Sequence, residues 1–118
     1  MAEISNQALA CSALAGISGQ LDEAKRLHEL AMRLARQYLN AARTGELPDA
    51  VRLSAPDPWK VLGPPDQRGP SDQKVMGTIQ SIAIMRAVDS LEAPPDTQEE
   101  KLAAAKAFTA ARCGAVGR

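Results

Sequence analysis

The chain has 118 residues, of which 45% are hydrophobic, and its 14 Lys and Arg residues balance 14 Asp and Glu residues. This length allows one domain spanning residues 1–118, and zero net charge argues against a general nucleic-acid binder, which needs a surplus of Lys and Arg. Alanine and leucine are abundant and aromatic residues make up only 3%, so we expect an all-α fold, a small bundle of three to four helices.

The first expected helix covers residues 4–15 and is followed by Gly16 and Gly19. Because a glycine inside a helix costs about 1 kcal/mol relative to alanine, we expect a hinge over residues 16–19. The alternative is one long helix whose glycines admit a close neighbour. The stretch from Ile4 to Leu21 carries no charge, but its Ser, Asn and Gln residues make it too polar to span a membrane. No positively charged segment precedes it, so we expect no signal peptide.

The strongest helical pattern covers residues 20–44. Its apolar residues recur at spacings of three and four, which draws one stripe along a helix; they are Leu21, Ala24, Leu27, Leu30, Ala31, Leu34, Ala35 and Tyr38. The basic residues of this helix are Lys25, Arg26, Arg33, Arg36 and Arg43. Such charges are usually a solvated face, but Arg33, Arg36 and Arg43 are also the candidate contact to phosphate or to an acidic protein surface.

Residues 46–71 contain six of the eight prolines of the chain. Proline removes an amide donor and fixes φ, so neither a long helix nor a central strand can run through this segment. We expect a long extended connection that holds Trp59 and Leu62. Trp59 either anchors the connection on the protein's own helices or presents itself, with Leu62, to another protein, since tryptophan is enriched at binding hot spots.

The next expected helix covers residues 71–92. Its apolar residues cover more than half of the helix surface; they are Val75, Met76, Ile79, Ile82, Ala83, Ile84, Met85, Val88 and Leu91. Such broad apolarity indicates burial on several sides, either at the centre of the monomer or at an oligomer contact. We place self-association, as a homodimer, at Ile79, Ile82, Met85 and Val88.

The last expected helix covers residues 97–113. Thr97 and Glu100 fit a capping box, in which Thr97 caps the helix and Glu100 reaches back to it. We expect Leu102, Ala105 and Phe108 to face inward, together with Ala111 or Arg112. This face is thin and mostly alanine, so the helix needs a packing partner.

Residues suited to catalysis are scarce. His28 is the only histidine and has no carboxylate at a helical neighbour position, so we expect a surface or boundary side chain rather than a general base. Two cysteines are few for a small secreted scaffold, so we expect Cys11 and Cys113 to be free thiols in a cytoplasmic protein. One histidine and two distant cysteines show no metal-ligand spacing, and no nucleotide-binding loop is present. We therefore expect no catalytic site, no metal and no cofactor.

These observations favour a small non-enzymatic helical protein that acts through protein–protein contacts, as an adaptor, an inhibitor or a structural subunit, and that self-associates. The partner is then another protein or a second copy, without a membrane. The alternative is a nucleic-acid-binding accessory or regulatory protein that uses the Arg33, Arg36 and Arg43 side of its helix. A third reading, an enzyme with a site near His28 and Cys11, lacks enough catalytic groups for most mechanisms.

Overall fold

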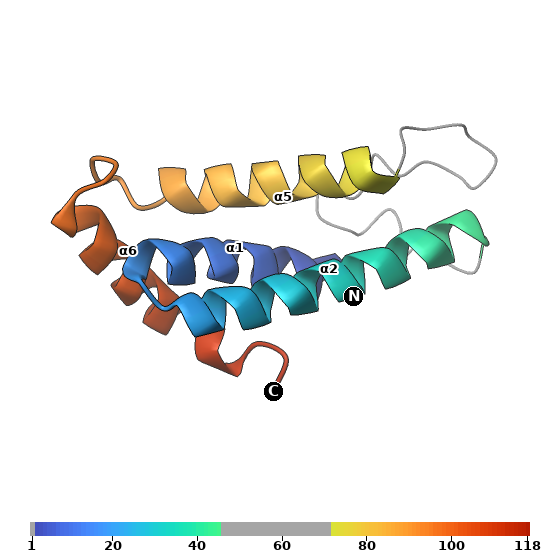
Figure 1. Cartoon of the computed structure of the whole chain (residues 1–118), viewed down its shortest axis with the longest axis horizontal. Coiled ribbons are helices and arrows are strands. Elements are labelled where there is room, and N and C mark those ends of the chain that lie inside the picture. The colour runs from blue at the N-terminus through green and yellow to red at the C-terminus, as the bar shows by residue number, and fades with distance from the viewer. Residues whose placement is uncertain (1, 46–71) are drawn as a thin grey trace.

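The computed structural model describes residues 2–45 and 72–118, which form four α-helices and a short 3-10 helix (Figure 1). The helices are α1 (Ala2–Ser18), α2 (Leu21–Arg43), α5 (Asp72–Asp89) and α6 (Gln98–Ala110), and the 3-10 helix is η1 (Cys113–Ala115). The all-α bundle is confirmed, and within the described ranges the chain contains no strand. The expected extended connection over 46–71, with Trp59 and Leu62, lies outside the described residues. None of the described helices is long and apolar enough to cross a membrane.

Helix α1 is the centre of the bundle. It packs against α2, α5 and α6, whereas α2 and α5 touch each other only slightly. In Figure 1, α5 runs in the same direction as α1, and α2 runs back along α1 in the opposite direction. The side chains that α1 buries are Ala8, Leu9, Cys11, Leu14 and Ala15. Small, uncharged residues let three neighbours approach one helix, so the stretch without charge is explained by burial.

The position of α5 answers one of the two interpretations of its broad apolarity, the one that places α5 at the centre of the monomer. Its buried row is Ile79, Ala83 and Ala87, which packs in the core, while Met85 on the opposite side is 63% exposed. Burial of α5 at the centre of the monomer is therefore wrong, since that place belongs to α1.

The predicted break after the first helix is confirmed, but it lies at Gly19, so that α1 continues through Gly16. Gly19 adopts φ 86°, and its N–H donates to the carbonyl of Gly16 at 3.3 Å. The N–H of Gln20 donates to the carbonyl of Ala15 at 2.8 Å. This pair of bonds is a Schellman motif, which needs a left-handed residue at its turn. Glycine adopts that conformation without the strain of a Cβ.

Two serine side chains of α1 fix the register between α1 and α2. The Ser5 hydroxyl donates to the carbonyl of Ala31 at 2.7 Å, and the Ser12 hydroxyl donates to the carbonyl of Ala24 at 2.9 Å. The stripe predicted on α2 supplies its buried side chains, which are Leu27, Ala31, Ala35, Tyr38 and also Leu39. Leu21 at the start of the stripe remains 71% exposed.

Helix α6 begins as predicted, with Thr97 as its N-cap. The Thr97 side chain accepts a hydrogen bond of 3.2 Å from the N–H of Glu100. The predicted inward face is partly wrong, because Leu102 is 63% exposed, while Phe108 is buried as expected. The side chains that α6 buries are Glu100, Ala104 and Phe108. An alanine-rich helix has no strong apolar stripe, so neighbouring helices rather than its own pattern determine which side is buried.

The prediction of free thiols is wrong, because Cys11 and Cys113 form a disulfide. Helix α6 leads the chain back across α1, and the left-handed Arg112 (φ 54°) turns it into η1. This places the two Cα atoms 5.5 Å apart, within the range that a disulfide requires. Both cysteines are buried in the core. The expectation of a cytoplasmic protein rested in part on free thiols, and the disulfide removes that part of its basis.

Candidate binding surfaces

An apolar groove runs along α1, between α2 and α5. Its volume is about 340 Å³. Helix α1 forms the floor, α5 forms one wall, and His28 of α2 stands on the other side; the lining residues are Leu9, Ser12, Ala13, Gly16, Ile17, His28, Gln80, Ile84 and Val88. The groove exists because α2 and α5 both pack on α1 but hardly meet each other. We call it the α1 groove.

The α1 groove has a polar end and an apolar end. Ser5 pairs with Ala31 and Ser12 with Ala24, so in this antiparallel register His28 lies level with the start of the groove floor, next to Leu9. Helices α1 and α5 run in the same direction (Figure 1), so Gln80 lies toward the Leu9 end, and Val88 lies toward the Ile17 end. His28 and Gln80 thus share one end, and the other end is hydrocarbon.

The polar side chains of the groove differ in their partners. The Ser12 hydroxyl donates to the carbonyl of Ala24. In the part of the chain that the structure describes, the side chains of His28 and Gln80 form no hydrogen bond or ion pair. His28 is half-buried at this boundary, as expected from the sequence. The groove therefore offers two hydrogen-bonding groups at one end of an apolar surface.

A second candidate surface is the side of α5 that faces away from α1. Gly77, Ser81 and Met85 recur every four residues, and all three are exposed. No charged residue lies between Gly77 and Met85 in the sequence. A Cβ added to Gly77 would have no atom within 4 Å. We call this row the outer row of α5.

The four residues expected to mediate self-association lie on different sides of α5. Ile79 is 1% exposed and belongs to the core of the chain. Ile82 is half-buried, and Val88 lines the α1 groove. Met85 is 63% exposed and lies in the outer row. The structure therefore leaves Met85 as the strongest candidate of the four for contact with another molecule.

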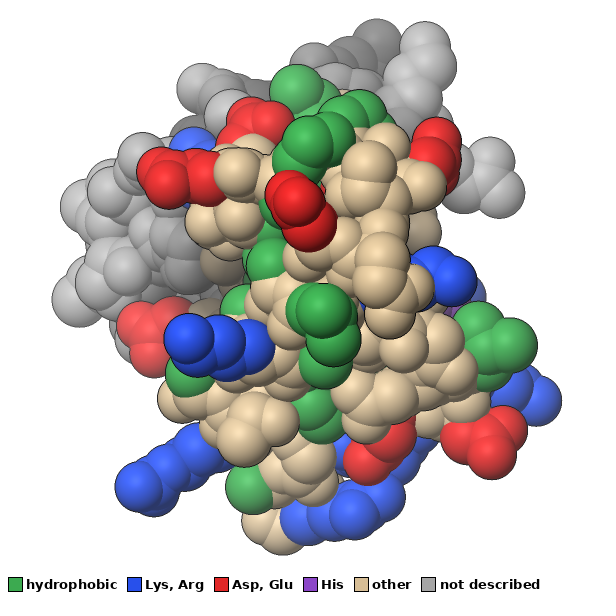
Figure 2. Space-filling view, turned by 90° about the vertical axis from the view of Figure 1, so that its left-hand side faces the viewer, with side chains coloured by type: hydrophobic (Ala, Val, Ile, Leu, Met, Phe, Trp, Pro, Cys, Tyr) green, Lys and Arg blue, Asp and Glu red, His purple; other side chains and the backbone are tan. Residues whose placement is uncertain are grey.

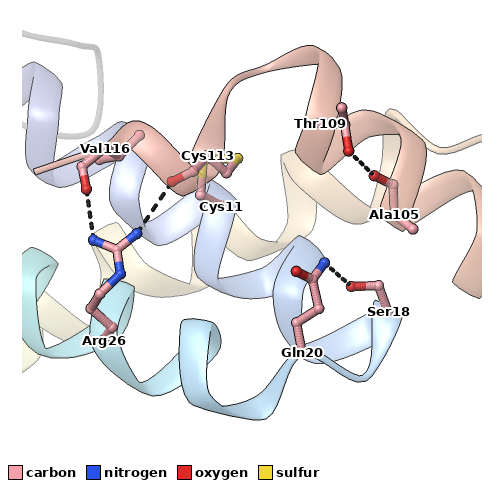
Figure 3. The surroundings of a disulfide bond; sticks show 8 residues. All are labelled: Cys11, Ser18, Gln20, Arg26, Ala105, Thr109, Cys113 and Val116. Atoms are coloured by element: carbon pink, nitrogen blue, oxygen red, sulfur yellow. Dashed lines mark hydrogen bonds between the residues drawn. A yellow bond between two sulfur atoms is a disulfide. The ribbon is translucent and has the colours of Figure 1, made fainter. Parts of the chain in front are cut away.

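The basic face predicted on α2 divides in two. Lys25, Arg33 and Arg36 are exposed on α2, and the Arg43 side chain lies outside the described side chains. Arg26 instead binds the C-terminal turn: its guanidinium donates to the carbonyl of Val116 at 2.7 Å and to that of Cys113 at 3.4 Å (Figure 3). Local sequence gives no sign of this role, since the acceptors lie about ninety positions away.

Glu23 completes this arrangement. It accepts a hydrogen bond from the Arg26 side chain and forms a second ion pair with Arg118, at 3.5 Å. The Arg26 hydrogen bond, and the positive charges of both arginines, lower the pKa of Glu23 although some burial opposes the shift. Arg26 and Glu23 therefore fasten the C-terminus to α2 beside the buried disulfide.

Charges are segregated at the α6 end of the molecule. From Asp89 to Glu100 the sequence has five acidic residues and no basic one, whereas from Lys101 to Arg118 it has four basic residues and no acidic one. Figure 2 shows this end: most acidic side chains lie in the upper half, most Lys and Arg side chains lie in the lower half together with some acidic ones, and hydrophobic side chains form a band from top to bottom. This distribution of charge does not by itself select one class of molecule.

No group of three or more His, Cys, Asp or Glu side chains that could hold a metal ion occurs among the described residues. Comparison with protein-family models, with curated proteins and with solved structures finds no match to this chain.

Proposed function

We propose that this protein acts by protein–protein contact and that its first partner is a second copy of itself, bound through the outer row of α5. The observation that carries the proposal is the row Gly77, Ser81, Met85. It is exposed and uncharged, and it combines a protruding side chain with a residue that has none. In a two-fold symmetric dimer both copies use the same surface patch, so that patch must be complementary to itself. The outer row of α5 meets this requirement.

The fit follows from the spacing. When two copies of α5 cross antiparallel at Ser81, Met85 of each copy comes opposite Gly77 of the other. Each step of four residues spans about 6 Å along a helix, so a side chain and a gap alternate at the same interval on both helices. Packing along rows of residues four apart is the commonest way in which helices pack in globular proteins. Met85 then fills the space that Gly77 leaves open.

The reactive side chains support binding rather than catalysis. Cys11 and Cys113 share a disulfide, so neither offers a thiol. In the described part of the chain His28 has no hydrogen bond to a carboxylate or a hydroxyl that could make it a general base.

The role that fits such a dimer is an adaptor, an inhibitor or a structural subunit. The cytoplasmic location expected from the sequence does not form part of the proposal, since disulfides persist mainly in oxidising compartments.

Sedimentation equilibrium over a range of concentrations tests the dimer. We expect the wild type to form a reversible dimer and Met85→Lys to be monomeric, because a charge at the crossing would lose its hydration. Leu102→Lys is the matched control, since Leu102 on α6 is as exposed as Met85, at 63%, and this variant should dimerise like the wild type.

Two results would contradict the proposal: a wild type that stays monomeric at every concentration, or equal loss of the dimer in both variants. A wild type that sediments with added DNA at low salt, and not with itself, would favour the nucleic-acid alternative through Arg33 and Arg36.

A further inference from the structure

The α1 groove is a separate surface from the outer row of α5, and its lining is polarised along its length. We propose that it binds a small amphiphile: a medium-chain alkyl carboxylate whose head group lies at His28 and Gln80 and whose tail extends over Ala13 toward Ile17 and Val88. This inference goes beyond the dimer and does not depend on it.

The head-group end provides donors. The Gln80 amide has two N–H donors, and an imidazole ring has at least one. Neither side chain has a partner within the described chain, so a bound acceptor would satisfy groups that otherwise depend on water. A carboxylate accepts hydrogen bonds on both oxygens and offers no competing donor. It therefore matches this end better than an amine.

The charges along α2 favour an anion. The row of α2 that contains His28 also contains Leu21, Lys25, Met32 and Arg36, at spacings of three and four residues. Lys25 and Arg36 are exposed, and this row has no acidic residue. Lys25 lies about one turn and Arg36 about two turns from His28 on the same side of the helix, so their charge favours an anion near His28 over an uncharged head group.

The tail end provides an apolar hollow. Ala13 and Gly16 keep the floor low, and Ile17, Ile84 and Val88 surround it. From Leu9 to Ile17 the floor spans about 12 Å, which suits a chain such as octanoate. The volume of about 340 Å³ lies at the lower end of the range of small-molecule sites, so larger lipids would remain largely outside.

Titration of the folded full chain with octanoate, followed by calorimetry and by amide NMR shifts, tests the proposal. We expect saturable binding, with shifts concentrated at the groove residues Leu9, Ala13, Ile84 and Val88. Gln80→Leu and His28→Leu should each weaken binding about tenfold, because a hydrogen bond to a charged group is lost. Octanol and butyrate, which lack the head charge or the length of the tail, should bind at least about tenfold more weakly.

A pair of glycine variants separates this site from the dimer. Gly16 and Gly77 are both helical, exposed, and without any atom within 4 Å of an added Cβ. Gly16→Leu should fill the groove and abolish octanoate binding while leaving the dimer intact. Gly77→Leu should abolish the dimer and leave octanoate binding intact.

Absence of saturable shifts in the groove would overturn the proposal, as would undiminished octanoate binding by a folded Gly16→Leu. Octanol binding as tightly as octanoate would also overturn it, because the head group would then not be recognised.

Discussion

At the scale of single residues, Arg26 shows how the same residue type serves opposite purposes on one helix. Arg33 and Arg36 are exposed, whereas Arg26 donates to two carbonyls of the C-terminal turn and to Glu23. Arg26 differs from Arg33 and Arg36 because the C-terminal turn packs beside it, not because of any property of α2 itself. A basic residue on a helix can therefore be structural even when the sequence groups it with solvated neighbours.

Replacement of Arg26 tests this role. We expect Arg26→Gln to lower the free energy of unfolding by about 1–2 kcal/mol, since carbonyls of the turn lose a charged donor. Arg33→Gln, its control, should change stability by less than about 0.5 kcal/mol. Urea unfolding of both variants measures the difference, and equal stabilities would contradict the assignment.

The Arg26→Gln substitution also changes the pKa of Glu23. Because Arg26 lowers the pKa of Glu23 in the folded protein, the ionised Glu23 stabilises the fold above its unfolded pKa, and this contribution is lost as the pH falls through the folded pKa. In Arg26→Gln the pKa of Glu23 should rise toward its ordinary value, and this part of the acid sensitivity should disappear. An NMR titration of Glu23 gives both pKa values. An unchanged pKa would show that Arg26 does not control it.

At the scale of elements, Gly19 separates α1 from α2 through its left-handed turn. Gly19→Ala should destabilise the protein by about 1–2 kcal/mol, because a Cβ strains this conformation. Gly16→Ala makes the same chemical change inside α1, in open space, and should stabilise the protein by about 0.5–1 kcal/mol. Thermal unfolding of the pair should show shifts of opposite sign. Shifts of the same sign would contradict the turn.

The elements also show what the sequence could predict. Gly19, Gly45 and Thr97 mark helix ends by local chemistry, so the sequence predicts the helix bounds to within a few residues. The central position of α1 could not be predicted, because a helix that packs on three neighbours has no single apolar stripe. The face of α6 was misassigned at Leu102 because alanines on every side gave no preferred direction. The α1 groove depends on three helices at once and leaves no local signal.

At the scale of the whole molecule, the disulfide joins the central helix to the end of the chain across 102 positions. No pattern within one helix reports a contact between segments so distant, so general cysteine statistics gave the wrong expectation. The bridge closes nearly the entire chain into a loop, with Arg26 and Glu23 fastening the same end from α2. The fold is therefore held at its last residues as well as in its core.

Removal of the disulfide should cost about 4–5 kcal/mol, the chain-entropy expectation for a loop of this length. Cys11→Ala with Cys113→Ala, compared with the oxidised wild type by urea unfolding, measures this cost. Reduction of the wild type in mild denaturant should give a similar loss. A double variant as stable as the oxidised protein would show that the bridge does not stabilise the fold.

A cysteine at residue 81 probes the proposed crossing of two copies of α5 at Ser81. Both native cysteines are bonded to each other, so Ser81→Cys introduces the only thiol. Because the proposed two-fold axis brings residue 81 of one copy against residue 81 of the other, mild oxidation should produce a covalent dimer in high yield from Ser81→Cys and little from Leu102→Cys. No covalent dimer from Ser81→Cys, or equal yields from both variants, would show that two copies do not meet across α5 at Ser81.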